Sequence, residues 1–215
     1  SCTMRFRTFI LPFALLMAQA VTAAAVDSTS QDIKNHVPPD VTGDLPRDVR
    51  AFVAAADTLL AYKPANSYGD GVSGAVIIVR HQVSEKSDYD FDDNPCELIA
   101  LRRENHELVE VDHSKKAVDC TYNDVARNAP AMSLNDNLTV APASIVYVNQ
   151  KDKGDTTFYF AWSKKKSTWY LQRATASNPD SGTGVRHVSA IYPMDFAWTP
   201  MSSVDPEAIA EVLQK

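Results

Sequence analysis

Thr156-Thr-Phe-Tyr-Phe-Ala-Trp-Ser163 is followed, after three lysines, by Ser167-Thr-Trp-Tyr-Leu-Gln-Arg-Ala-Thr175. Apolar and polar residues alternate in both runs, and this period of two is typical of β-strands. Because the connection is short, the two strands must pair antiparallel; a parallel pair needs a long crossover. The side chains expected to pack across this hairpin are Phe158, Phe160, Trp162, Trp169 and Leu171.

Similar runs flank this hairpin on both sides, separated by short polar turns. The further strands expected from them are Gly74–Val83, Cys96–Arg103, Glu107–Asp112, Ala117–Tyr122, Ala143–Gln150 and Val185–Ile191. With the hairpin they predict an antiparallel meander of seven or eight strands.

Helices are expected at the two ends of this strand region. Between Pro46 and Pro64, apolar residues recur with the i, i+3, i+4, i+7 spacing of an amphipathic helix. These residues are Val49, Phe52, Val53, Ala56, Leu59 and Leu60. A second, short helix is expected from Asp205 to Leu213, because Asp caps a helix and Pro suits its first position. The predicted fold class is α+β, with a sheet that curls around or packs against the first helix.

Composition sets limits on the function. The chain has 215 residues, of which 45% are hydrophobic and 22% charged, which excludes a disordered tail. Lys and Arg number 21 against 27 Asp and Glu, so the net charge is -6. This charge gives no bulk attraction to nucleic acid or to an anionic membrane.

The first 25 residues have the three parts of a secretory signal peptide. Met4-Arg-Phe-Arg7 is basic, Phe9–Met17 is apolar, and Ala18-Gln-Ala20 opens a stretch of small residues. Ser1–Thr3 are expected to be leftover residues upstream of the natural start. The apolar run is too short for a stable membrane span. We therefore expect a periplasmic or secreted protein without a membrane anchor.

Removal of this segment would leave a polar leader over residues 26–44 and a single domain over 45–215. Arg5 and Arg7 would be lost, leaving 19 basic against 27 acidic residues and a net charge near -8. Cys2 would also be lost, so that only Cys96 and Cys120 remain. An even cysteine count in an exported chain predicts a disulfide, worth about 3 kcal/mol on the chain-entropy model.

An acidic stretch, Asp88-Tyr-Asp-Phe-Asp-Asp-Asn94, precedes Cys96. Its alternating carboxylates resemble the start of a calcium loop, but Asp93 and Ile99 stand where Gly and Glu are needed. A solvated loop and a docking surface for a basic partner are the other interpretations. The candidate partner-binding residues are Asp88, Tyr89, Asp90, Phe91, Asp92 and Asp93.

No stretch assembles a catalytic, metal or cofactor motif. Gly71-Val-Ser-Gly-Ala75 lacks the last glycine of a nucleophile elbow and precedes a strand instead of following one. The histidines, His36, His81, His106, His113 and His187, form no metal-binding pair. We assign no catalytic residue, metal or cofactor, and expect Lys164–Lys166 to be a soluble hairpin turn.

These observations favour an exported, non-catalytic protein that binds another macromolecule. Most concretely, it would be a periplasmic immunity or inhibitor protein that neutralises an envelope-acting toxin or hydrolase with a basic surface. One alternative is a secreted hydrolase that gathers His81, His113 or His187 with a carboxylate. Another is a small-ligand carrier whose apolar pocket is lined by Phe158, Phe160, Trp162 and Trp169.

Overall fold

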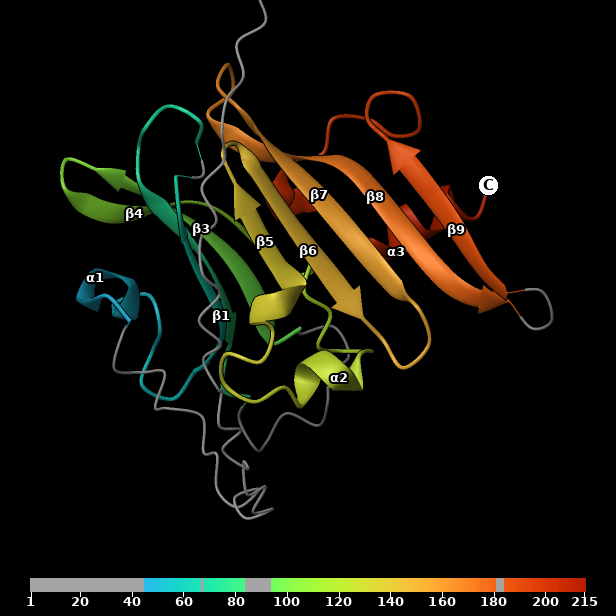
Figure 1. The fold of residues 1–215 in the computed structure, drawn as a ribbon, viewed down its shortest axis with the longest axis horizontal. Coiled ribbons are helices and arrows are strands. Elements are labelled where there is room, and N and C mark those ends of the chain that lie inside the picture. Colours follow the sequence, from blue (N-terminus) through green and yellow to red (C-terminus); the bar gives the residue numbers. More distant parts are fainter. Residues whose placement is uncertain (1–44, 67, 84–93, 181–183) are drawn as a thin grey trace, which may run out of the picture. The chain divides into compact units, whose positions relative to one another are not determined.

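The computed structural model describes residues 45–66, 68–83, 94–180 and 184–215. Within them, nine strands form two antiparallel sheets, each with its strands in chain order (Figure 1). Sheet A comprises β1 (Thr58–Ala65), β2 (Gly74–Arg80), β3 (Cys96–Glu104) and β4 (Glu107–Ser114). Sheet B comprises β5 (Leu138–Ala141), β6 (Ser144–Gln150), β7 (Asp155–Ser163), β8 (Thr168–Asp180) and β9 (Gly184–Ile191). The antiparallel meander is confirmed, but it is divided between two sheets.

Short helices connect and cover the sheets. They are α1 (Arg47–Arg50), α2 (Asp124–Arg127) and α3 (Pro206–Leu213), with 3₁₀ turns η2 (Asn135–Asn137) and η3 (Met201–Ser203). None of the helices in the described part of the chain is long and apolar enough to cross a membrane. The expected signal peptide (1–25), the leader (26–44) and the acidic residues 88–93 lie outside the described residues.

The main core lies between the inner faces of the two sheets. Sheet B supplies Phe158, Phe160 and Trp169, each at most 1% exposed, while sheet A supplies Val76 and Ile78 among others. The expected hairpin is confirmed: Phe160 pairs with Leu171 and Trp162 with Trp169. The rings of Trp162 and Trp169 lie 5.6 Å apart.

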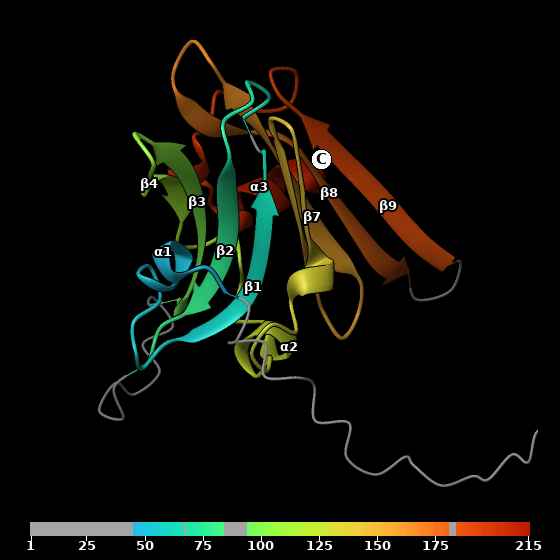
Figure 2. The ribbon, with the colours of Figure 1, turned by 60° about the vertical axis from the view of Figure 1, so that its left-hand side comes forward.

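Sheet A is covered on its other face as well. Ile77, Val79 and Leu101 form a second apolar cluster with Val49 of α1, and Phe52 packs against it. Figure 2 shows α1 beside sheet A, on the side away from β7–β9. The central strands β2 and β3 are therefore buried on both faces, which explains the unbroken apolar run of β2.

The predicted N-terminal helix is wrong over most of its length. Helix α1 ends at Arg50, and β1 begins at Thr58. Leu59 packs in the second cluster and Leu60 in the main core. The side chains of these adjacent residues therefore point to opposite faces of β1, as in a strand. The four-residue helix has no side-chain cap at Pro46, and a helix this short has little stability of its own. Pairing with β2 satisfies the backbone of the later residues instead.

The predicted strand Ala117–Tyr122 is also wrong, because this segment is a loop, in which Ala117, Val118 and Cys120 are buried. Its backbone N–H groups donate hydrogen bonds to side chains, whereas the prediction had them pair with a neighbouring strand. The Oδ1 atom of Asn149 accepts from the N–H of Asp119, 3.0 Å away, and the Oδ1 of Asn94 accepts from Cys120, 2.8 Å away. The loop therefore needs no sheet partner.

The predicted disulfide is confirmed between Cys96 at the start of β3 and Cys120 in this loop. Both cysteines are buried, at 0% and 1% exposure. The Asn94 amide lies beside the bridge and donates to the carbonyls of Lys115 and Val118, 2.7 Å away in each case. The bridge and Asn94 together hold the loop against the first residues of β3.

Candidate functional site

The three histidines named for the hydrolase alternative lie at different strands. His81 follows β2, His113 lies on β4 and the exposed His187 lies on β9, which belongs to the other sheet. His113 forms a 2.7 Å contact through Nδ1 with Glu110 on its own strand.

His81 is held between two carboxylates. Its Nδ1 lies 2.8 Å from Oδ2 of Asp57, and its Nε2 lies 2.8 Å from Oε2 of Glu97. Burial acts to lower the pKa of His81, but hydrogen bonds to Glu97 and Asp57 and their charges outweigh burial and raise that pKa. Because both ring nitrogens are engaged, neither offers a free lone pair for general-base chemistry.

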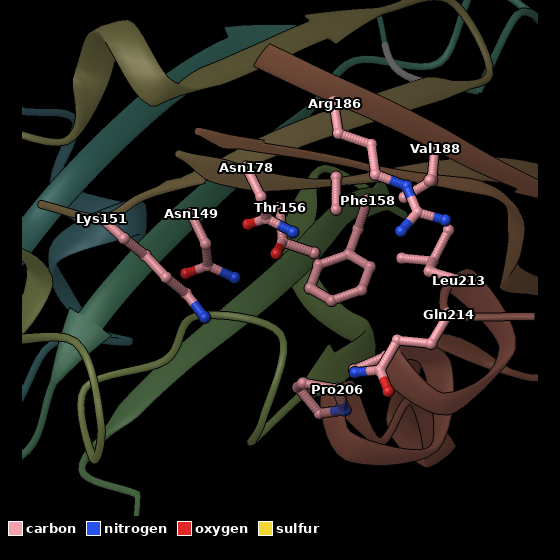
Figure 3. Close-up of a pocket in the computed structure, with 12 residues that line it drawn as sticks. Asn149, Lys151, Thr156, Phe158, Asn178, Arg186, Val188, Pro206, Leu213 and Gln214 are labelled. Carbon is pink, nitrogen blue, oxygen red and sulfur yellow. The ribbon is translucent and has the colours of Figure 1, made fainter. Parts of the chain in front are cut away.

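A hollow of about 210 Å³ lies between the inner face of sheet B and α3 (Figure 3). We call it the α3 groove. Its polar lining consists of Asn149, Lys151, Thr156, Asn178, Arg186 and Gln214. Its apolar lining consists of Phe158, Ala176, Val188, Pro206, Ala210 and Leu213.

Strand register sets the order of the groove's residues. Asn149 pairs with Thr156, Thr156 with Ala176, and Ala176 with Val188, so these four form one row across β6–β9. Lys151 directly follows the last residue of β6. Arg186 pairs with Asn178, two residues along β8 and β9 from the pair Ala176 and Val188. Three inter-strand steps of about 4.8 Å place β6 and β9 about 14 Å apart, so the two cations rise from opposite sides.

The turn that carries Lys151 depends on a glycine. Gly154 has a φ of +79°, and a Cβ there would lie 1.9 Å from the carbonyl oxygen of Ser177. The N–H of Lys151 donates to the Gly154 carbonyl at 3.1 Å and closes the turn. Only glycine allows this approach to β8, and the turn then presents the Lys151 side chain at the groove.

Helix α3 forms the other wall for reasons visible in its sequence. The Asp205 side chain caps it by accepting from Glu207 N–H at 3.0 Å, and Pro206 occupies the first turn. Ile209 and Leu213 are buried against the main core. Lys116 lies 2.9 Å from Asp205, and this hydrogen bond holds the pKa of Asp205 below its ordinary value. The predicted C-terminal helix is thus confirmed.

The electrostatics of the groove favour an anion. No carboxylate lines it, whereas Lys151 and Arg186 both do. Neither side chain has an ion-pair partner among the described residues. Figure 3 shows both charged ends directed toward the space around Phe158. The lining offers cations, amides and an apolar floor, which is a set of groups for binding.

The aromatic residues expected to line a carrier's pocket mostly fill the core. Phe160 and Trp169 are buried, and Trp162 packs against the main core. Phe158 contributes to the α3 groove, and Trp162 to a separate shallow hollow with Arg102 and Lys164. The cavity enclosed by all four rings is therefore not found.

Sequence reasoning missed the α3 groove because its residues come from four strands and a helix. The strand at 185–191 and the terminal helix were both predicted, but their adjacency was not. The acidic residues Asp88–Asp93 are outside the described residues, so their partner-binding role stays a prediction. Within the described ranges, no group of three or more His, Cys, Asp or Glu side chains could hold a metal ion.

No family model matches the chain, and comparisons with curated proteins and with solved structures also find no match.

Proposed function

We propose that the protein is an exported, non-catalytic binding protein and that it holds its partner at the α3 groove. The observation that carries this proposal is the pair of cations, Lys151 and Arg186, over an apolar floor. Both side chains are exposed, so their charges are accessible to an anionic group on a partner. The twelve lining residues contain no His, Cys, Asp or Glu, the usual acids, bases and strong nucleophiles, which favours binding over turnover.

In its most concrete form, the proposal is a periplasmic immunity or inhibitor protein that neutralises an envelope-acting toxin or hydrolase. The groove would receive one anionic, partly apolar group of that partner as an anchor. The acidic residues Asp88–Asp93 would meet a basic part of the same partner and accelerate the encounter. A protein partner fits the size of the groove, which is too small for a drug-sized molecule.

The experiment is capture from an envelope extract on the immobilised chain, in wild-type and groove-blocked forms. Ala210→Trp fills the groove from an exposed position of α3, whereas Ala208→Trp adds the same ring on the same helix away from it. We expect a stoichiometric protein to be retained by wild type and by Ala208→Trp but lost with Ala210→Trp. That protein must be a toxin or hydrolase whose activity falls on addition of an equimolar amount of the chain. Retention by all three forms would place the interface elsewhere.

The acidic stretch gives a second, kinetic test of the same proposal. Replacing Asp88, Asp90, Asp92 and Asp93 together by Asn should slow association with the captured protein more than it speeds dissociation. The effect should shrink at high salt, because screening shortens the reach of exposed charges to about 8 Å at 0.15 M. Unchanged association kinetics would remove this stretch from the interface.

A small-ligand carrier is the second candidate, favoured by the apolar surface that Val188, Ala210 and Leu213 give the groove. In that case a small molecule would copurify with the chain. Mass spectrometry of the denatured, freshly exported protein distinguishes the carrier from the protein-binding form.

A further inference from the structure

We infer that the α3 groove binds a carboxylate attached to a short apolar chain, with the carboxylate at Arg186 and Lys151 and the chain on Val188, Ala210 and Leu213. This inference rests on the proposed function, which makes the groove a binding site, and it adds the chemical class of the bound group. Two sources supply this chemistry: a free short-chain fatty acid, or the last residue of a polypeptide that ends in an apolar side chain.

The head of the ligand is argued from the cations. The guanidinium of Arg186 presents paired N–H donors that match a carboxylate, and Lys151 adds a charge from the opposite side. The amides of Asn178 and Gln214 line the same opening, as Figure 3 shows. With no carboxylate in the lining, an incoming anion meets only donors and cations around its head.

The start of α3 gives the groove no free N–H groups of the kind that phosphates favour. Phosphates favour the free N–H groups at the start of a helix, but at α3 the Asp205 carboxylate already accepts from Glu207 N–H. Pro206, the groove residue nearest that end, has no N–H to offer. The head is therefore recognised by side chains alone, in the planar geometry that suits arginine with a carboxylate.

The tail is argued from the volume and the floor. At about 30 Å³ for a water-sized group, the groove of about 210 Å³ holds roughly seven such groups. A carboxylate takes about two of them and leaves room for about five further carbons. Ala176, Val188, Ala210 and Leu213 offer these carbons an apolar surface above the buried Phe158 ring. Each methylene that leaves water should strengthen binding about four-fold until the groove is full.

The test is isothermal titration of the purified chain with acetate, butanoate, hexanoate, octanoate and decanoate. We expect affinity to rise with length up to about six or seven carbons and then to level off or fall. Hexanol and hexylamine, which keep the tail without the anion, should bind at least ten-fold more weakly than hexanoate. The inference is overturned if no carboxylate binds, if hexylamine or hexanol equals hexanoate, or if hexyl phosphate binds more tightly.

Variants locate the binding. Arg186→Gln should weaken hexanoate about ten-fold or more, whereas Lys165→Gln, an exposed residue in the β7–β8 turn, removes the same charge without effect. Ala210→Trp should abolish binding, and Ala208→Trp should leave it intact. These four positions are exposed, so folding is retained and a thermal melt verifies it. Binding that survives both Arg186→Gln and Ala210→Trp would show that hexanoate sits elsewhere and overturn the inference.

A final pair of ligands identifies the source and separates the two proposals. Tighter binding of N-acetyl-leucine than of hexanoate supports a polypeptide C-terminus, and the reverse order supports a free fatty acid. If an extract protein is retained through the groove while no carboxylate binds, the proposed function stands and the ligand class fails. If carboxylates bind while no protein is retained, the ligand class stands and the protein-binding form fails.

Discussion

Sheet A and sheet B have similar topology but different surroundings. In sheet A, five consecutive residues of β2, Ala75–Val79, are buried, because apolar clusters lie on both faces. In sheet B, β7 buries Phe158 and Phe160 inward, while the alternate residues Tyr159 and Ala161 stay half-buried on the outer face. A sheet covered on both faces has little freedom to carry polar groups, whereas sheet B carries them on its outer face and in the α3 groove at the end of its inner face.

The largest expected effect tests this difference in burial. Ile77→Ala, in the second cluster of sheet A, should lower the free energy of unfolding by about 2–5 kcal/mol, because it leaves a cavity. Thr175→Ala, on the half-buried outer face of sheet B, should change it by less than about 1 kcal/mol. Urea denaturation of both variants measures the contrast. Equal losses would mean that the outer face of sheet B is covered as well.

The disulfide should come next. Cys96→Ser should cost about 3 kcal/mol, because the bridge closes a loop with a sequence separation of 24 residues. Cys120→Ser should cost the same, and reductant should lower the Tm of wild type but not of either variant. Intact-mass analysis with and without alkylation checks the bridge itself. Two free thiols in the native exported chain would contradict the prediction.

The start of α3 should contribute less. Asp205→Ala removes the helix cap and the ion pair with Lys116, and should cost about 1 kcal/mol. Asp205→Asn keeps a capping oxygen and should cost only a few tenths of a kcal/mol. Thermal melts in the same buffer compare the two variants. A loss with Asn as large as with Ala would assign the stabilisation to the ion pair rather than to the cap.

The smallest expected effect is the pH-dependent contribution of His81 at the edge of sheet A. Since its pKa is raised in the folded chain, the protonated ring stabilises fully below the unfolded value of about 6.5. That stabilisation is lost as pH rises through the folded pKa. The half-exposed side chain limits the effect to below about 1 kcal/mol.

The measurement for His81 is the difference in Tm between wild type and His81→Gln across pH 5–9. We expect the difference to be largest near pH 5 and to decline toward pH 9. His187→Gln, on the exposed face of β9, is the control and should show no such trend. If the Tm difference between wild type and His81→Gln grew with pH, the conclusion that folding raises the pKa of His81 would be wrong.

Local patterns accounted for much of the strand content but not for the segment at 51–65. Leu59 and Leu60 fit a helical spacing in the sequence, yet each packs on a different side of β1. The spacing of apolar residues indicates which side chains are buried but not against what they pack. Adjacent side chains that are buried on opposite faces of a strand can therefore give the same spacing as a helix. The strand β5 was also missed, because its four residues are too few to show a clear alternation of apolar and polar side chains.

The sequence by itself determined the β7–β8 hairpin, the Cys96–Cys120 bridge and the C-terminal helix. Each depends on signals that lie close together in the chain: alternation, an even cysteine count in a chain expected to be exported, and the Asp205-Pro206 start. Only the tertiary structure decided the division into two sheets, the change from helix to strand after Arg50, and the α3 groove. The groove joins Lys151, Arg186 and Ala210, whose sequence separations are wide. No local pattern encodes such a meeting, because it follows from strand register and from the packing of α3 on sheet B.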